Sequence, residues 1–261
     1  MRDSMYSAFF GAMTQEAQMN ITSNNLANVN TTGYKRQATA FEDVFVRFAS
    51  DYADPNITLE DRLPWPDDKL RSQTRVSPDH VVLEEGPLKN TGNPLDLAIS
   101  GEGFFKVQTP EGETAYTRNG SFYRDPEDGS MITAQKFQLL GEGGPIIIPE
   151  DAGRVVVSED GQVSADGAVL GVIDLVSVDN LNALEKMGSS LLRVREGAEA
   201  QEIAAEDARV NQGFLEESNV QVVNEMVSMI SIMRNFEALQ KVITTTQEKD
   251  QQLIRDVGTT R

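Results

Sequence analysis

The residues that could support catalysis or bind a metal are few in this sequence. His80 is the single histidine, and cysteine is absent. A zinc site takes several histidine, cysteine or carboxylate ligands, and a catalytic nucleophile needs a base beside it. One histidine next to Asp79, with no second ligand or nucleophile close by, favours a surface or strand-edge residue. We therefore predict no catalytic residue and no metal site.

Carboxylate pairs and glycine-rich turns add little chemistry. Glycoside hydrolysis needs two carboxylates about 5–9 Å apart across a cleft, but with 41 acidic residues a pair in sequence carries little information. DPEDGS at 125–130 lacks the alternating oxygen ligands and final glutamate of a calcium loop. GEG at 101–103 and GEGGP at 141–145 lack features that nucleotide-binding loops require. Turns explain all three stretches, and no cofactor is expected.

The net charge of −18 is unevenly distributed along the 261 residues. Residues 1–50 carry 4 basic and 4 acidic side chains and residues 218–261 carry 5 of each, so 51–217 holds the remaining 14 basic and 32 acidic residues. An acidic surface disfavours nucleic-acid binding. The neutral ends are where packed copies would repel each other least.

Hydropathy also limits the cellular context. No run approaches 18 apolar residues, so no transmembrane helix is expected. The first twenty residues lack a basic region and a continuous apolar run, so we expect no cleaved signal peptide. The absence of cysteine excludes disulfides.

The first segment is expected to form a helix from about Ser4 to Ala27. One set of residues recurs every seven positions: Met5, Ala12, Met19 and Leu26. A second set follows three residues after the first three: Ala8, Gln15 and Thr22. This spacing predicts a thin coiled-coil seam. The asparagine-rich stretch SNNLANVNTTGYK should end the helix near Asn28.

The last segment shows a stronger apolar pattern. Residues that alternate in steps of four and three are Val222, Met226, Met229, Met233, Phe236, Gln240 and Ile243. Further apolar residues widen this stripe: Val223, Ile230, Ile232, Leu239 and Val242. Ser218 or Asn219 is the expected N-cap. A helix that is apolar on more than one side should contact more than one neighbour.

Between these ends the pattern is that of strands. FFKVQ at 104–108 and ETAYT at 113–117 predict a hairpin, and Asp-Gly pairs at 128, 160 and 166 predict tight turns. RVVVS at 154–158 and LGVIDLVSV at 170–178 are expected to be buried strands. The proline-rich stretch 51–78, which contains the only tryptophan, Trp65, is interpreted as a loop or irregular extension.

Three blocks in this order resemble the axial proteins of the bacterial flagellum, meaning rod and hook subunits. The first is SNNLANV at 23–29 followed by GYKR at 33–36, and its motif residues are Asn24, Asn25, Leu26, Ala27, Asn28 and Gly33. The others are GNPLDLAISGEGFFKVQTPEGETAYTRNGSF at 92–122 and GFLEESNVQVVNEMVSMISIMRNFEALQKVITT at 213–245. Within the rod proteins, LLGEGGPIIIPE at 139–150 and NFEALQKVI favour the proximal type, with the distal type as the alternative.

The resemblance implies a non-enzymatic subunit, exported through the flagellar type III apparatus, that polymerises in the periplasm with copies of itself and other rod proteins. It implies a rod near peptidoglycan, with the terminal helices forming its inner layer. The expected assembly residues are Met5, Ala12, Met19, Leu26, Val222, Met226, Met229, Met233, Phe236 and Ile243.

The fold class we expect is α+β, with terminal helices paired as a coiled coil around a central β-rich domain. The expected divisions are a helix and turn at 1–35, an irregular extension at 36–78, a β-rich domain at 79–212 and a helix at 213–261. Two alternatives from other classes are a secreted carbohydrate-active enzyme with a carboxylate-lined cleft and an adhesin- or toxin-like binding module with a helical stalk.

Overall fold

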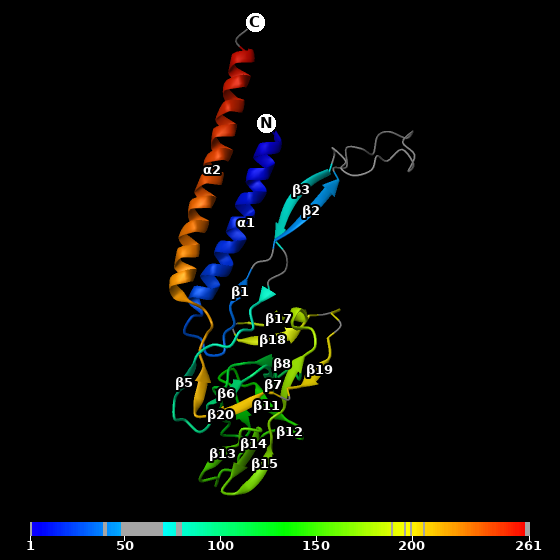
Figure 1. Cartoon of the computed structure of the whole chain (residues 1–261), viewed down its shortest axis with the longest axis vertical. Helices are drawn as coiled ribbons and strands as arrows, with labels where there is room; N and C mark the ends of the chain where they lie inside the picture. Colours follow the sequence, from blue (N-terminus) through cyan, green and yellow to red (C-terminus); the bar gives the residue numbers. More distant parts are fainter. Residues whose placement is uncertain are drawn as a thin grey trace, which may run out of the picture. The chain divides into compact units, whose positions relative to one another are not determined.

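The computed structural model describes residues 2–38, 41–47, 70–76, 80–188, 190–195, 197–198, 200–205 and 207–258. The chain divides into two compact units (Figure 1). The helical unit comprises Met1–Ser23, Thr39–Asp79 and Met226–Arg261. The β unit comprises Asn24–Ala38 and His80–Glu225. The chain therefore passes between the two units four times, at 23–24, 38–39, 79–80 and 225–226.

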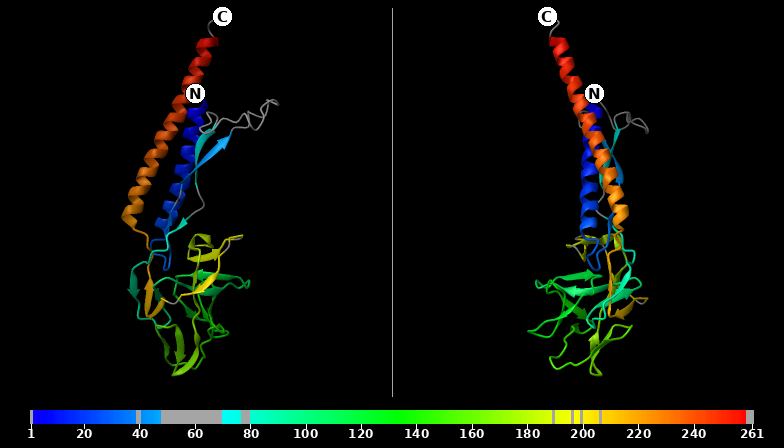
Figure 2. Two further views of the ribbon diagram at one scale, coloured as in Figure 1. Left: turned by 45° about the vertical axis from the view of Figure 1, so that its right-hand side comes forward. Right: turned by 90° about the vertical axis from the view of Figure 1, so that its left-hand side faces the viewer.

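Two α-helices form from the described residues, α1 (Arg2–Ala27) and α2 (Val222–Gly258). They contact each other and run antiparallel, as both sets of views show (Figures 1 and 2). The predicted pairing of the terminal helices around a β-rich middle is thus confirmed. The expected N-cap at Ser218 or Asn219 is wrong, because α2 begins at Val222, three residues after Asn219.

A hairpin formed by β2 (Phe41–Arg47) and β3 (Leu70–Val76) belongs to the helical unit. Its strands pair antiparallel from Phe41 opposite Val76 to Arg47 opposite Leu70. The loop interpretation of 51–78 is therefore wrong for 70–76. The rest of that stretch, including Trp65, lies outside the described residues.

The β unit holds the remaining described strands, which are mostly short. In its first half they are β1 (Gln37–Ala38), β4 (His80–Val81), β5 (Leu88–Asn90), β6 (Leu97–Ser100), β7 (Phe104–Gln108), β8 (Thr114–Thr117), β9 (Tyr123–Arg124), β10 (Met131–Ile132), β11 (Gln138–Gly141) and β12 (Gly144–Pro145). In its second half they are β13 (Val155–Val157), β14 (Gln162–Ala165), β15 (Ala168–Val172), β16 (Leu175–Val178), β17 (Leu184–Lys186), β18 (Leu191–Val194), β19 (Glu202–Ala204), β20 (Arg209–Gln212) and β21 (Phe214–Glu216), with one 3₁₀ turn, η3 (Leu181–Ala183).

The largest sheet runs in the order β17-β18-β8-β7-β11-β10-β9, with β16 also pairing with β7 and with β19, and β12 with β11. A three-stranded sheet, β13-β14-β15, and the pairs β1-β4, β20-β6 and β21-β5 complete the unit. Its main core gathers fully buried side chains such as Leu97, Phe105, Phe122, Met131 and Leu139. Phe105 and Phe122 meet edge to face with their centroids 5.3 Å apart. The segments 88–90 and 214–216, which are far apart in the sequence, pair antiparallel as β5 and β21.

Several sequence predictions hold in this unit. β7 and β8 form the predicted hairpin, with Phe105 opposite Thr117. The three Asp-Gly pairs lie in turns, and both residues of Asp166-Gly167 have positive φ, as the tight turn between β14 and β15 requires. His80 is exposed at the end of a two-residue strand, as expected of a strand-edge residue.

The predicted single strand over 170–178 is wrong, since it divides into β15 and β16. The Ile173 N–H donates to Gly161 O and the Asp174 N–H donates to Leu140 O, so the chain leaves one sheet for another at this point. The strand predicted at 154–158 is present at Val155–Val157, but it is only partly buried because Val156 faces solvent.

Candidate assembly surface

The contact between the two helices is made by one face of α2. Ile232 is buried and Met229, Phe236, Leu239 and Ile243 are half-buried, in steps of three and four. This is the spacing of a coiled-coil seam.

On α1, Gly11 faces Leu239 so closely that an added Cβ would lie 3.3 Å from its Cδ1. Ala8, one turn before Gly11, and Ala12, the residue after it, are buried. Small residues on α1 therefore let the helices approach closely.

The expected assembly residues fall into two groups in the structure. Ala12 is buried, and the others that lie half-buried are Met5, Met19, Leu26, Met229, Phe236 and Ile243. Those exposed to solvent are Val222, Met226 and Met233. The heptad stripe therefore has a different register from the one predicted. The buried seam continues through Ile232 and Leu239, where the prediction placed Met233 and Gln240.

The opposite side of α2 is also apolar, and it is exposed. We define the α2 outer face as Met226, Val227, Ile230 and Met233, and Val227 is 62% exposed. At about 100° per residue, Val227 and Ile230 lie across the helix from Ile232 and Leu239, and Met226 and Met233 flank them on one side. Val222 and Val223, in the first turn of α2, are exposed as well. The first half of α2 is thus apolar on two opposite sides.

A smaller apolar patch lies on α1. We define the α1 outer patch as Phe9 and Met13, which are 53% and 52% exposed. They are one turn apart on the side of α1 that faces away from Gly11. Phe10 meets Phe9 edge to face, with ring centroids 6.1 Å apart. Exposed aromatic and methionine side chains grouped in this way are typical of a protein-binding surface.

The asparagine-rich motif ends α1 and folds the following chain back on it. The buried Asn25 side chain donates from Nδ2 to Gln37 O, and its Oδ1 accepts from the Tyr34 hydroxyl and the Gln37 N–H. Asn28 Nδ2 donates to Asn24 O, and the chain turns directly after Ala27. The predicted helix end near Asn28 is confirmed.

The motif residues next to Asn25 make fewer contacts with the returning chain. Asn24 Nδ2 donates to Gln37 Oε1 across 3.2 Å, Leu26 is half-buried, and Ala27 is exposed. Asn25 is therefore the side chain that satisfies the backbone of the returning segment.

Gly33 is the position where the backbone geometry demands glycine. Its φ of +67° lies in the left-handed region, and an added Cβ would lie 2.3 Å from Asn119 N. The Gly33 N–H donates to Glu216 O across 2.8 Å. No other residue fits at this approach without moving the backbone. The chain that leaves α1 is thereby bonded to the strand that precedes α2.

Buried charges reinforce this connection. Glu216 is 1% exposed, and its Oε1 accepts from Lys35 Nζ across 2.6 Å and from the Gly86 N–H. Its Oε2 lies 3.5 Å from Arg118 Nη1. Burial lowers the pKa of Lys35 and of Arg118, and the Glu216 charge opposes this effect in both. The Glu216 carboxylate therefore forms ion pairs with two buried cations, Lys35 and Arg118, from distant parts of the chain.

Asn219 extends the connection toward α2. Its Oδ1 accepts from the Arg36 N–H, and its Nδ2 donates to Val82 O and Glu84 O. These bonds explain why Asn219 does not cap the helix, since its side chain is used elsewhere. The Arg36 guanidinium lies 3.9 Å from Glu225, which is buried in the first turn of α2.

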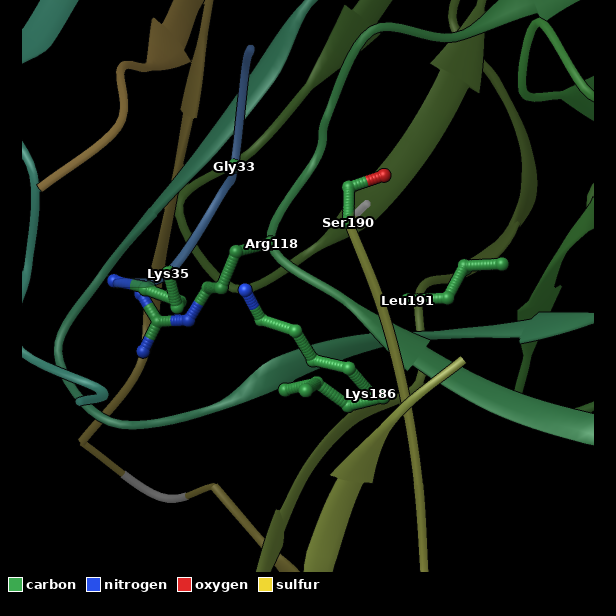
Figure 3. A pocket seen from close by; sticks show the side chains of 7 residues that line it. Gly33, Lys35, Arg118, Lys186, Ser190 and Leu191 are labelled. Atoms are coloured by element: carbon green, nitrogen blue, oxygen red, sulfur yellow. The ribbon is translucent and has the colours of Figure 1, made fainter. Parts of the chain in front are cut away.

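A small cavity lies beside the buried charges (Figure 3). It is lined by Gly33, Lys35, Arg118, Lys186, Ser190, Leu191 and Leu192. Its room of about 10 Å³ suits one water-sized occupant. The Lys186 ammonium lies over the Tyr34 ring, 3.6 Å from its centroid. The cavity is too small for an organic substrate.

Sequence reasoning missed Arg118 and Glu216 and assigned Lys35 no role. Glu216 lies 181 residues from Lys35 and 98 from Arg118, so no local spacing joins them. The available signal was that each lies inside a block that resembles the rod family. Among the described residues, no group of three histidine, aspartate or glutamate side chains is arranged to hold a metal. In the same part of the chain, neither helix is apolar enough over a sufficient length to cross a membrane.

Three family models match successive parts of the chain. They are described as flagella basal body rod protein at 5–35, flagellar hook protein FlgE/F/G D1 domain at 98–165, and flagellar basal body rod FlgEFG protein C-terminal at 211–256. The first covers the asparagine motif, and the third covers β21 and nearly all of α2. The first match therefore contains Lys35, the second contains Arg118, and the third contains Glu216.

Full-length relatives agree with these matches. The chain is 37% identical to the flagellar basal-body rod protein FlgF of Caulobacter vibrioides, over 99% of both chains. It is 34% identical to FlgG of Buchnera aphidicola subsp. Acyrthosiphon pisum, over 93% of this chain and 95% of that one, and 32% identical to FlgG of Bacillus subtilis, over 96% and 97%. These relatives give no support to the carbohydrate-active enzyme or the adhesin-like module. The chain belongs to the flagellar basal-body rod protein family, as its three sequence blocks predicted, and is a structural subunit rather than an enzyme.

Proposed function

We propose that this chain is the FlgF-type, proximal subunit of the rod, and that it polymerises through its terminal helices into the shaft that transmits torque. Two relatives from one organism support the FlgF type. In Caulobacter vibrioides the identity is 37% to FlgF and 31% to FlgG. The FlgG type of distal rod remains the alternative within the family.

The observation that carries the assembly proposal is the α2 outer face. Four large apolar side chains stay exposed on a helix whose other side is already packed on α1. Fully burying a large apolar side chain contributes about 1.5–3 kcal/mol. Contact with a neighbouring subunit would bury this face, and the neutral ends of the chain allow many copies to approach.

We assign the expected assembly residues two separate roles. Val222, Met226 and Met233 contact neighbouring subunits. Within the subunit the helix pair is held by Met5, Ala12, Met19, Leu26, Met229, Phe236 and Ile243. The motif of Asn24, Asn25, Leu26, Ala27, Asn28 and Gly33 joins the first helix to the strand that precedes the second.

The proposed divisions of the chain follow the same logic. The segments 1–35 and 213–261 supply the axial core, 36–78 is an extension, and 79–212 forms the outer β-rich domain. Its excess of acidic residues faces the surroundings of the shaft. We further propose export through the flagellar type III apparatus, a place in the periplasmic rod, assembly with copies of itself and other rod proteins, and proximity to peptidoglycan.

A charge on the exposed face tests the assembly role without disturbing the helix pair. Val227→Asp places a carboxylate on the α2 outer face, whereas Asn235→Asp places one on an exposed polar position of the same helix. We expect Val227→Asp to abolish motility and Asn235→Asp to preserve it, with equal helical content by circular dichroism. A fully motile Val227→Asp strain would refute the assembly role of this face.

The rod type is tested separately by deleting the gene and imaging the basal bodies. A proximal subunit predicts arrest before any distal rod is added. Basal bodies that retain the proximal rod and stop only at the distal part would favour the FlgG type.

A further inference from the structure

We infer that the small cavity beside the buried charges is a binding site for one monatomic anion of the size of chloride. The cationic side chains that line it are Lys35, Arg118 and Lys186. All of the lining residues belong to the β unit, so the site lies within one compact part of the chain. The inference is independent of the proposed rod function, because it concerns what the folded β unit binds.

The charges around the cavity are unbalanced. Its three cations come from three separate segments, and Figure 3 shows their side chains gathered close together. The other described residues that line it are Gly33, Ser190, Leu191 and Leu192, none of which is acidic. Lys35 and Arg118 share the Glu216 carboxylate, at 2.6 and 3.5 Å. These two buried cations thus carry one positive charge more than the carboxylate between them, and a bound anion would neutralise it.

The buried cations also act on each other. Burial is the main cause that lowers the pKa of the Lys35 ammonium, and the Arg118 charge lowers it further. Glu216 and the exposed Glu85 act in the opposite direction, but the pKa still lies below its usual 10.5. Charges in a buried site interact strongly because solvent screens them little. An anion in the cavity would stabilise the charged forms of both side chains.

The Arg118 guanidinium has an N–H group available for such an ion. Its Nη1 donates to Ile99 O and its Nη2 donates to Gly101 O. Its Nε is buried and has no hydrogen-bond partner among the described residues. A buried donor without an acceptor costs free energy, and such groups are rare in folded proteins. Because the Arg118 side chain lines the cavity, an acceptor bound there can receive this hydrogen bond.

The size of the cavity and its donor groups select the class of ligand. Room of about 10 Å³ admits one monatomic or water-sized occupant and excludes phosphate, sulfate and carboxylates. Ammonium and guanidinium groups donate hydrogen bonds and accept none, so they suit an occupant that only accepts. Chloride meets this condition, whereas water must also donate. Ser190 and Leu191 are half-buried, so the cavity lies close enough to solvent for an ion to exchange.

A bound anion would join three segments that are remote in the sequence. Lys35 follows the asparagine motif, Arg118 follows β8, and Lys186 ends β17. The site exists only when these segments are folded together, so chloride stabilises the folded β unit by mass action. The net charge of −18 disfavours nonspecific adsorption of anions on this chain. An anion retained at the cavity would therefore report the local arrangement of cations.

Chloride NMR on the full chain tests the site in solution. Chloride that exchanges with a protein site gives a broadened resonance, and added bromide reverses the broadening by competition. Lys186→Met removes one lining charge and keeps an unbranched stem beside the Tyr34 ring. Lys89→Met is the matched control, because Lys89 is exposed and far from the lining residues in sequence. We expect Lys186→Met to weaken chloride binding about tenfold and Lys89→Met to bind like the native chain.

Crystals of the native chain grown in sodium bromide locate the ion, because bromide scatters anomalously. We expect an anomalous peak among Lys35, Arg118 and Lys186. Water without an anomalous signal at this place would overturn the proposal, and so would equal line broadening from the native chain and Lys186→Met. The bromide measurement needs no variant, so it decides the question even if Lys186→Met fails to fold. None of these results bears on the Val227→Asp test of rod assembly.

Discussion

Replacing Gly33 by alanine should destabilise the β unit far more than the same change at Gly92. Both glycines have nearly the same left-handed backbone, with φ of +67° and +71°. An added Cβ at Gly92 meets no atom within 4 Å, whereas at Gly33 it would lie 2.3 Å from Asn119 N. The pair therefore separates the cost of the backbone conformation from the cost of the close approach.

The expected magnitudes follow from these two terms. Holding an alanine in the left-handed region costs about 1–2 kcal/mol, and this applies to both variants. At Gly33 the backbone must also move, which breaks the 2.8 Å bond from its N–H to Glu216 O. Losing that bond costs about 1 kcal/mol, and the buried groups around Glu216 shift with it. We expect a loss of about 3 kcal/mol at Gly33 against about 1 kcal/mol at Gly92.

Hydrogen exchange across a urea series measures these losses in the full chain, with peptides from β7 and β8 reporting on the β unit. Equal losses from the two variants would refute the reasoning. They would mean that the approach of Gly33 to Asn119 does not hold this turn in place.

Three further changes probe other contacts. Glu216→Gln leaves Lys35 and Arg118 buried without a carboxylate, so urea unfolding should show a loss of about 3–5 kcal/mol, and an unchanged midpoint would contradict the buried ion pair. Ile232→Ala should cost about 2–4 kcal/mol of helix pairing, seen as an earlier loss of helical circular dichroism on heating, and an unshifted melt would mean that the seam lies elsewhere. Partial burial acts to raise the pKa of the Glu202 carboxyl. Hydrogen bonds from Lys106 and Tyr116 outweigh this effect, so the pKa lies below its usual 4.5. Glu202 therefore stabilises the fold above about pH 4.5, and this contribution is lost as the pH falls through the lowered value. Glu202→Gln should flatten the decline of melting temperature between neutral and acidic pH, and an identical decline in both proteins would count against it.

The helices and hairpins could be predicted because their signals are local. The end of α1 follows from its asparagines, and the β7-β8 hairpin follows from two alternating runs around TPEG. The division of 170–178 could not be predicted in this way. Its cause is the pairing of Ile173 and Asp174 with backbone groups in two different sheets, and those groups lie elsewhere in the sequence.

The register of the α2 seam was ambiguous for a related reason. Because α2 is apolar over a wide arc, it offers two adjacent heptad stripes that share Met229, Phe236 and Ile243. The partner decides between them, because Gly11 admits Leu239 and so places that side of α2 against α1. Composition alone could not reveal which apolar side remained free.

The buried charges were the least predictable part of the site. Glu216 gave no sign of its importance in a chain with 41 acidic residues. Its role depends on a fold that brings three family blocks together within hydrogen-bonding distance. The resemblance to rod proteins located those blocks, but only the topology shows that one carboxylate connects them.

The exposed α2 outer face is the central feature of this account, and the rod content of purified basal bodies tests it most directly. Basal bodies are isolated from strains that carry the native chain, Val227→Asp or Asn235→Asp, and the amount of this subunit in them is measured by quantitative mass spectrometry. We expect the native level for Asn235→Asp and near-complete loss for Val227→Asp, with both variants equally abundant in whole cells. A native level of Val227→Asp in assembled basal bodies would contradict the account.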